Sequence, residues 1–127
     1  MATRILGKVG LGVQGKTVEV EAIFDTGATR SFVSLELAEK LGYIRHDKPE
    51  EVLLATKGKK ASMVGELVAR ITILGYMLPL SHVFGAIEGL NHDTIIGMDI
   101  MEPYEIVVDA KEGKAAFRKF PPTIEIV

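Results

Sequence analysis

The sequence predicts one all-β domain, spanning residues 1–127, that contains one short helix. Apolar or alternating runs recur along the whole chain and are separated by turns that contain glycine, which is typical of β-strands. Only residues 34–42 show a clear helical pattern. A length of 127 residues, with 47% apolar and 25% charged residues, suits a single domain with a hydrophobic core and excludes a disordered chain.

Two strands and the helix are expected in the first third of the chain. Residues 5–13 and 17–24 should form strands joined by a turn at residues 14–16. The second of these reads VEVEAIF at its end, so it alternates and then becomes wholly apolar, as in a strand that runs from an exposed edge into the core. In the helix, Ser34 is a suitable N-cap and Gly42 suits the C′ position.

The rest of the chain is also predicted to be mostly strand. We expect strands at residues 51–56, 61–74, 77–84 and 94–97, a bend at Gly65, a helical turn near residues 99–102, and a hairpin made by residues 104–109 and 114–120. The lysine-rich residues 57–60 should form an exposed turn between the first two of these strands.

Composition narrows the range of functions. The formal net charge is −2, so overall charge does not favour nucleic-acid binding. The chain has no cysteine, and His46, His82 and His92 are scattered without metal-ligand spacing, so we expect no metal and no cofactor. No apolar run approaches the roughly 18 residues of a membrane helix. We therefore expect a cytoplasmic protein without a membrane partner.

The stretch IFDTGAT, residues 23–29, carries the strongest functional signal. Asp25 follows an apolar run, where an uncompensated carboxylate is costly. The small residues Gly27 and Ala28 come directly after it and leave the backbone open to the approach of a ligand or a second chain. An isolated Asp-Thr-Gly tripeptide can equally well be an ordinary turn. However, an aspartate in a turn usually follows polar residues, and Asp25 follows apolar ones.

Two facing aspartates can perform hydrolysis that one aspartate cannot. Like charges a few ångströms apart share one proton, so the charged member can activate water while the protonated member polarises a carbonyl. The sequence contains only one Asp-Thr-Gly motif, and a second aspartate would come from a second copy of the chain across a two-fold axis. We therefore predict that Asp25 is buried against its own symmetry mate.

Two motifs give the chain a resemblance to a known family. IFDTGAT is similar to the active-site motif of the retropepsin-like aspartic proteases, a group that includes retroviral and retrotransposon proteases and the related domain of DNA-damage-inducible shuttle proteins. The stretch IIGMDIM, residues 95–101, is similar to the second hallmark of that family. The resemblance covers about residues 13–117. It implies a closed acid-protease barrel, a homodimer, and a peptide or protein substrate.

The resemblance also implies roles for single residues around the motif. Asp25 would be the catalytic residue, and Thr26 would hydrogen-bond across the dimer. Gly27 would lie against the substrate backbone, and Ala28 would allow close packing there. Three residues of the second motif would brace the active-site loop from behind: Ile95, Ile96 and Gly97.

A flap and a dimer contact are implied as well. The flap that closes over substrate would be the hairpin tip that contains Thr56, Lys57, Gly58 and Lys59, with Lys60 at its end. Its lysines depart from the glycine-rich, apolar flaps of viral members. The C-terminal hairpin could supply dimer contacts through Ile106, Val107, Val108 and Phe117, or it could be an ordinary core hairpin.

The leading hypothesis is a homodimeric aspartic endopeptidase. The same fold could instead serve as a peptide-binding or dimerisation module with a weak or inactive dyad. A third possibility is a monomer whose Asp25 is exposed and idle. The intact Asp-Thr-Gly favours the enzyme, because a binding role has no need of a buried acid.

Overall fold

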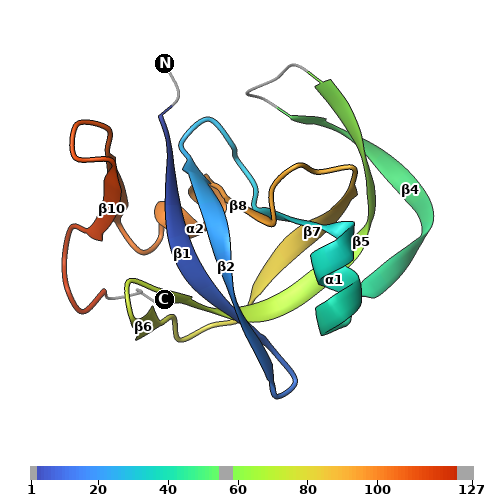
Figure 1. The fold of residues 1–127 in the computed structure, drawn as a ribbon, viewed down its shortest axis with the longest axis horizontal. Coiled ribbons are helices and arrows are strands. Elements are labelled where there is room, and N and C mark those ends of the chain that lie inside the picture. Colours follow the sequence, from blue (N-terminus) through green and yellow to red (C-terminus); the bar gives the residue numbers. More distant parts are fainter. Residues whose placement is uncertain (1–2, 55–58, 123–127) are drawn as a thin grey trace.

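The computed structural model describes residues 3–54 and 59–122 (Figure 1). Its elements are β1 (Arg4–Val13), β2 (Lys16–Asp25), β3 (Phe32–Ser34), α1 (Leu35–Leu41), β4 (Ile44–Leu54), β5 (Lys59–Ile73), β6 (Tyr76–Met77), β7 (His82–Glu88), β8 (Thr94–Ile96), α2 (Met98–Met101), β9 (Ile106–Asp109) and β10 (Lys114–Phe117). The all-β prediction is confirmed, with both expected helical segments in place.

Six strands form a closed sheet. Neighbours follow the order β1-β2-β8-β3-β7-β5, and an additional pairing of β1 with β5 joins the two ends of this path. The strand β4 extends the sheet from β5, and β6 pairs with β5 as well. Closure pairs the backbone groups that an open sheet would leave at its edges. The chain therefore has the closed barrel that was expected.

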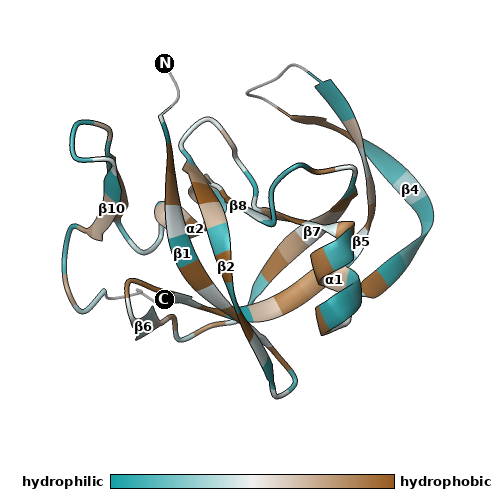
Figure 2. Cartoon of the chain, viewed as in Figure 1, coloured by the Kyte–Doolittle hydropathy of each residue, from teal (hydrophilic) through white to brown (hydrophobic). Residues whose placement is uncertain are grey.

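The hydrophobic core lies inside this sheet. Its fully buried side chains come from strands distant in sequence and include Leu11, Val33, Leu67, Phe84 and Ile96. Figure 2 shows the contrast between the apolar end of β2 and the largely hydrophilic β4, which lies outside the ring. The apolar run at the end of β2 thus delivers Asp25 to the inner part of the molecule.

The helix α1 forms as its end residues predict. The Ser34 side chain accepts a hydrogen bond from the Leu37 N–H, and the Gly42 N–H donates to the Ala38 carbonyl. Gly42 has a φ of 98°, which favours glycine. Leu37, Ala38 and Leu41 are buried, so the helix covers the sheet with one apolar face.

Two strand predictions were wrong in their boundaries, and one short strand was missed. The strand β4 begins at Ile44, earlier than the predicted residue 51. The predicted strand over residues 77–84 divides into β6 and β7, because Pro79, which lacks an N–H, stands between them. Between the two strands, the Leu78 N–H donates a hydrogen bond of 2.8 Å to the Ile71 carbonyl, and the Leu78 side chain is buried. The short strand β3 was not predicted.

The C-terminal hairpin forms a small second sheet from β9 and β10. Ile106 is part of the chain's own core, and Val108 and Phe117 pack against it. Tyr76 contacts Phe117 edge to face, with ring centroids 6.0 Å apart. Packing within the chain itself therefore accounts for these apolar side chains, as predicted for an ordinary core hairpin, and no second chain is needed to cover them.

Gly65 provides a first test of the packing. A register shift between Met63 and Gly65 in the pairing of β5 with β7 marks the bend expected there. A Cβ at Gly65 would overlap the Ile44 carbonyl and lie 2.8 Å from the Tyr43 ring. We expect Gly65→Ala to lower the free energy of unfolding by about 2 kcal/mol.

The matched control is Gly12→Ala, where the nearest atom to the new Cβ would be 3.6 Å away. Chemical denaturation of both variants checks the prediction, with the control expected within about 0.5 kcal/mol of wild type. Equal stability of the two variants would contradict the close approach of β4 to Gly65.

His82 provides a test of pH dependence. Its Nε2 lies 2.7 Å from the Tyr104 hydroxyl, and burial lowers the pKa of His82 below 6.5 although Asp99 partly opposes the shift. Because the folded pKa is depressed, the unfolded chain binds the proton more tightly. The contribution of neutral His82 to the free energy of unfolding is complete above pH 6.5. It declines as the pH falls from 6.5 to the pKa that His82 has in the folded chain.

We therefore compare the free energy of unfolding at about pH 7.5 and about pH 5, a range that spans the titration of histidine. This free energy should fall more in wild type than in His82→Gln. Denaturation curves at several pH values give the measurement. The other histidines are common to both proteins, so the difference isolates His82. Parallel stability profiles would contradict the predicted linkage.

Candidate active site

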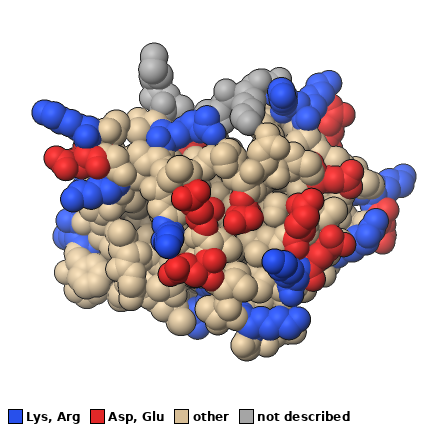
Figure 3. Space-filling view, in the orientation of Figure 1, with Lys and Arg blue, Asp and Glu red and all other residues tan. Residues whose placement is uncertain are grey.

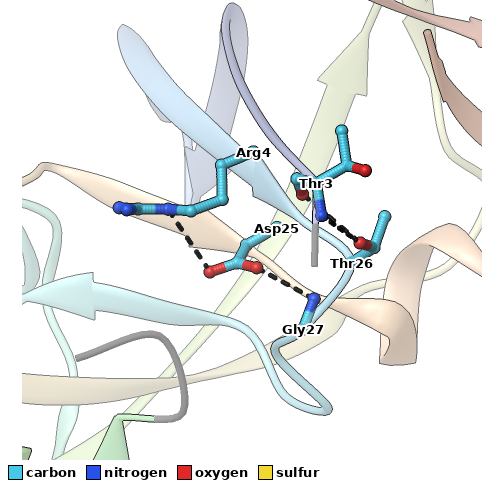
Figure 4. Close-up of polar contacts among 5 residues, drawn as sticks. All are labelled: Thr3, Arg4, Asp25, Thr26 and Gly27. Carbon is cyan, nitrogen blue, oxygen red and sulfur yellow. Dashed lines mark hydrogen bonds and ion pairs between the residues drawn. The ribbon is translucent and has the colours of Figure 1, made fainter. Parts of the chain in front are cut away.

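Asp25 is the last residue of β2 and is buried, with only 2% of its surface exposed. Its Oδ1 accepts a hydrogen bond of 2.9 Å from the Gly27 N–H. Its Oδ2 lies 3.7 Å from Nε of Arg4, which stands opposite Asp25 in the register of β1 and β2. Figure 4 shows the carboxylate between these two groups. Both compensate the negative charge that burial would otherwise make costly.

The burial of Asp25 therefore arises within a single chain. This finding corrects the expectation that a symmetry mate would be needed to bury the carboxylate. It also contradicts the third possibility, a monomer with an exposed acid. The folding of this strand end therefore does not need a second Asp25.

Thr26 is held by the start of the chain. Its backbone N–H donates to the Thr3 carbonyl at 3.0 Å, and its hydroxyl accepts a 2.7 Å bond from the Thr3 N–H. The same hydroxyl can donate to the Thr3 carbonyl at 3.3 Å (Figure 4). The single chain thus occupies the hydroxyl for which a bond across a dimer was expected. That intersubunit bond stays a prediction.

The turn after Asp25 is tied back to the second motif. The Ala28 N–H donates to the Asp25 carbonyl at 3.1 Å, and the Ala28 carbonyl accepts from the Met98 N–H at 2.8 Å. A Cβ at Gly97 would overlap the Arg30 carbonyl and come within 2.7 Å of the Ala28 carbonyl. Only glycine allows the two loops to approach this closely.

The strand β8 supports β2 immediately before Asp25. The two strands are parallel, with Ile95 beside Ile23 and Ile96 beside Phe24. Ile96 is completely buried, and Ile95 is 9% exposed and also faces the cleft described below. The structure therefore places Ile95, Ile96 and Gly97 behind the active-site loop, where the resemblance implied.

A side-chain network that the sequence analysis missed joins the two motifs. The Ser31 hydroxyl donates to Asp99 at 2.7 Å and accepts from the Gly97 N–H at 2.9 Å. The Ser31 N–H also donates to the Asp99 carboxylate, at 3.1 Å. Ser31 is 1% exposed, so these bonds replace water. The sequence analysis could have singled out Asp99, because it belongs to the IIGMDIM motif. Its partner Ser31, however, lies 68 residues away in the sequence.

A cleft of about 310 Å³ opens above Asp25. The apolar part of its lining is made by Phe32, Leu53, Leu54, Ile87, Leu90 and Ile95. Of the residues predicted to contact substrate, Ala28 and Lys59 line the cleft and Gly27 does not. Their contact with a substrate stays a prediction. Thr56, Lys57 and Gly58, the predicted flap residues, lie outside the described residues. Lys60, at the end of the predicted flap, also lines the cleft, whereas Arg4 and Arg30 were not predicted to do so.

Within residues 3–54 and 59–122, no group of three or more His, Cys, Asp or Glu side chains is arranged to hold a metal ion. In the same part of the chain, no helix has the length and apolar character needed to cross a membrane.

An Asp-Thr-Gly turn whose aspartate is buried and lines a cleft, and which is backed by a glycine loop inside a closed sheet, defines an aspartic-protease-like domain. The sequence model of the family described as "Aspartyl protease" matches residues 9–100. The chain belongs to this family. The match includes Asp25 and most of the second motif.

Two curated relatives have the name "DNA damage-inducible protein 1". The protein from Neurospora crassa is 29% identical over 100 residues, and that from Phaeosphaeria nodorum is 28% identical over 101 residues. These alignments cover 78% and 79% of this chain. The aligned region spans only 22% of the length of either relative, so it corresponds to one part of a much longer protein.

Two solved structures share the fold. The retroviral protease-like domain of Ddi1 from Leishmania major aligns with a TM-score of 0.63 and 20% identity, over 96% of this chain and 94% of that domain. A retropepsin-like aspartic protease from Rickettsia conorii aligns with a TM-score of 0.51 and 19% identity, over 86% and 85% of the two chains. The retropepsin-like fold predicted from the two motifs is confirmed.

The Ser31–Asp99 network yields a prediction for stability. We expect Asp99→Ala to lower the free energy of unfolding by about 1–3 kcal/mol, because it leaves the buried Ser31 hydroxyl and N–H without their acceptor. The matched control is Glu102→Gln, at the exposed end of α2, which should change little. Thermal and chemical unfolding provide the measurement. An Asp99→Ala protein as stable as the control would show that the network does not hold the loops together.

Proposed function

We propose that the protein is an aspartic endopeptidase in which two copies of the chain each contribute Asp25. The observation that carries this proposal is the placement of a buried carboxylate on the floor of a cleft, with the Gly27 N–H fixing one oxygen. Membership of the aspartyl protease family supports it. The substrate class is a peptide or protein segment, with apolar side chains suited to the leucine and isoleucine lining of the cleft.

The chemistry needs a second carboxylate, and the described residues of one chain do not supply a suitable one. Asp99 is engaged with Ser31 behind the loop. Glu88 is the other acid among the described lining residues, but it is exposed at the end of β7. A two-fold axis through the active-site turn would bring a second Asp25 to the first with the same geometry.

In this mechanism, water lies between the two carboxylates, which share one proton. The ionised carboxylate takes a proton from water as the oxygen attacks the scissile carbonyl carbon, and the protonated one donates to the carbonyl oxygen. Collapse of the resulting tetrahedral intermediate transfers a proton to the leaving amine and cleaves the C–N bond. Arg4, which contacts Oδ2 in the single chain, must then share that oxygen or move from it.

The ion pair between Arg4 and Asp25 favours one alternative. If Arg4 keeps its contact with Oδ2, the carboxylate is neutralised and the cleft acts only as a peptide-binding site. The two functions differ in one observable. A binding module retains peptides unchanged, whereas the enzyme releases fragments.

Substitution of Asp25 tests the proposal. We expect Asp25→Asn to reduce cleavage of a mixed peptide library, between about pH 3 and 7, by about 10²–10⁴-fold or more, since the amide cannot act as general base. The control is Glu88→Gln, which removes the other described cleft acid and should leave cleavage within a few-fold of wild type. Mass spectrometry of the products gives the rates. A folded wild type that releases no fragments would favour the binding module.

Mixing experiments test the shared site. When wild type and Asp25→Asn are combined in equal amounts and allowed to exchange, random pairing leaves only about a quarter of the dimers with two aspartates. Activity per wild-type chain should therefore fall by about half. A monomeric enzyme would show no loss on addition of the variant, and sedimentation of the mixture would report its oligomeric state.

A further inference from the structure

The cleft has a charge opposite to that of the whole chain. Its described lining residues include four basic side chains, Arg4, Arg30, Lys59 and Lys60, and two acidic ones, Asp25 and Glu88. The full sequence has 15 basic and 17 acidic residues. In Figure 3 acidic side chains predominate in the middle of the face, and basic side chains lie around its edge, including its upper part. In the cleft, basic side chains outnumber acidic ones among the described lining residues. Such a distribution raises the local concentration of anionic ligands.

Two of these four cations are already engaged. Arg4 contacts Asp25 at 3.7 Å, and Lys60 contacts Glu51 at 3.1 Å. Arg30 and Lys59 have no ion pair within the part of the chain that the structure describes. These two cations are therefore the ones available to a ligand in the cleft.

Arg30 is the better placed of the two. Its backbone is fixed on both sides, because the Ala28 carbonyl accepts from Met98 and Ser31 is held by Asp99. Arg30 itself is exposed and borders the cleft only five positions after Asp25. A guanidinium on a fixed backbone can bind a carboxylate through two parallel N–H···O bonds, which a lysine cannot do.

We propose that Arg30 determines specificity by binding an acidic side chain, Asp or Glu, of a peptide held in the cleft. The inference rests on the proposed peptide-binding site but does not require cleavage. The apolar side chains Leu53, Ile87 and Ile95 line the same cleft and would take the neighbouring apolar residues of the peptide. The preferred ligand class is thus a mixed acidic and apolar segment.

The test measures binding separately from cleavage. A randomised decapeptide library, acetylated and amidated to remove terminal charges, is captured on immobilised Asp25→Asn protein and read by mass spectrometry. We expect enrichment of Asp or Glu at one position relative to the apolar residues. The best binder is then synthesised with Glu or Gln at that position, and both affinities are measured by fluorescence anisotropy for each variant.

We expect the Glu peptide to bind roughly three- to fivefold more tightly than the Gln peptide, with a ratio that declines as salt is added. In the Asp25→Asn background, Arg30→Gln should bring this ratio close to one, and Arg30→Glu should invert it. The matched control is Arg45→Gln. Arg45 is also exposed and has no ion pair among the described residues, but it lies on β4 outside the cleft.

Several outcomes would overturn the inference. These are a library without acidic enrichment, a Glu preference that survives Arg30→Gln, an equal loss in Arg45→Gln, or no retained peptide at all. Cleavage by wild type is scored in a separate assay. A Glu preference that depends on Arg30, without any cleavage, would support the inference and reject the endopeptidase. Cleavage without a Glu preference would support the endopeptidase and reject the inference about Arg30.

Discussion

The burial of one carboxylate at the end of β2 constrains the rest of this structure. Asp25 is 2% exposed, so groups in its own chain must compensate its charge. The Gly27 N–H does so from the turn, and Arg4 does so from the neighbouring strand. The turn must therefore curl back toward the strand end, which small residues at positions 27 and 28 allow. The position of the carboxylate is thus fixed before any ligand or second chain is present.

A second layer of contacts holds that turn in place from behind. The strand β8 runs parallel to β2, and its continuation, Gly97, packs against the carbonyls of the turn. Ser31 and Asp99 then join the two loops through bonds that are shielded from water. Two sequence motifs about seventy residues apart therefore make one rigid unit.

Much of the fold could be predicted because its signals are local. The capping residues of α1 and the apolar run before Asp25 needed no tertiary information. The role of Arg4 was missed for a definable reason. A three-residue turn at positions 14–16 would place Ile5 opposite Asp25, whereas the actual two-residue turn, Gln14–Gly15, places Arg4 there. A slip of one residue reverses which face of a strand each side chain occupies. The Ser31–Asp99 pair was missed because no local pattern reports a contact across 68 residues.

The contact between Arg4 and Asp25 also bears on how a dimer would form. In the single chain, a partly exposed guanidinium faces Oδ2, and in a dyad a second carboxylate needs a place beside the first. Two such carboxylates hold one net negative charge when they share a proton, so they need less compensation than two separate anions. Formation of the pair would therefore weaken the hold of Arg4 on Asp25. Arg4 already lines the cleft, so its release would leave a second cation beside Arg30 for a ligand. Pairing of the chains would then both complete the dyad and make the cleft more attractive to an acidic peptide.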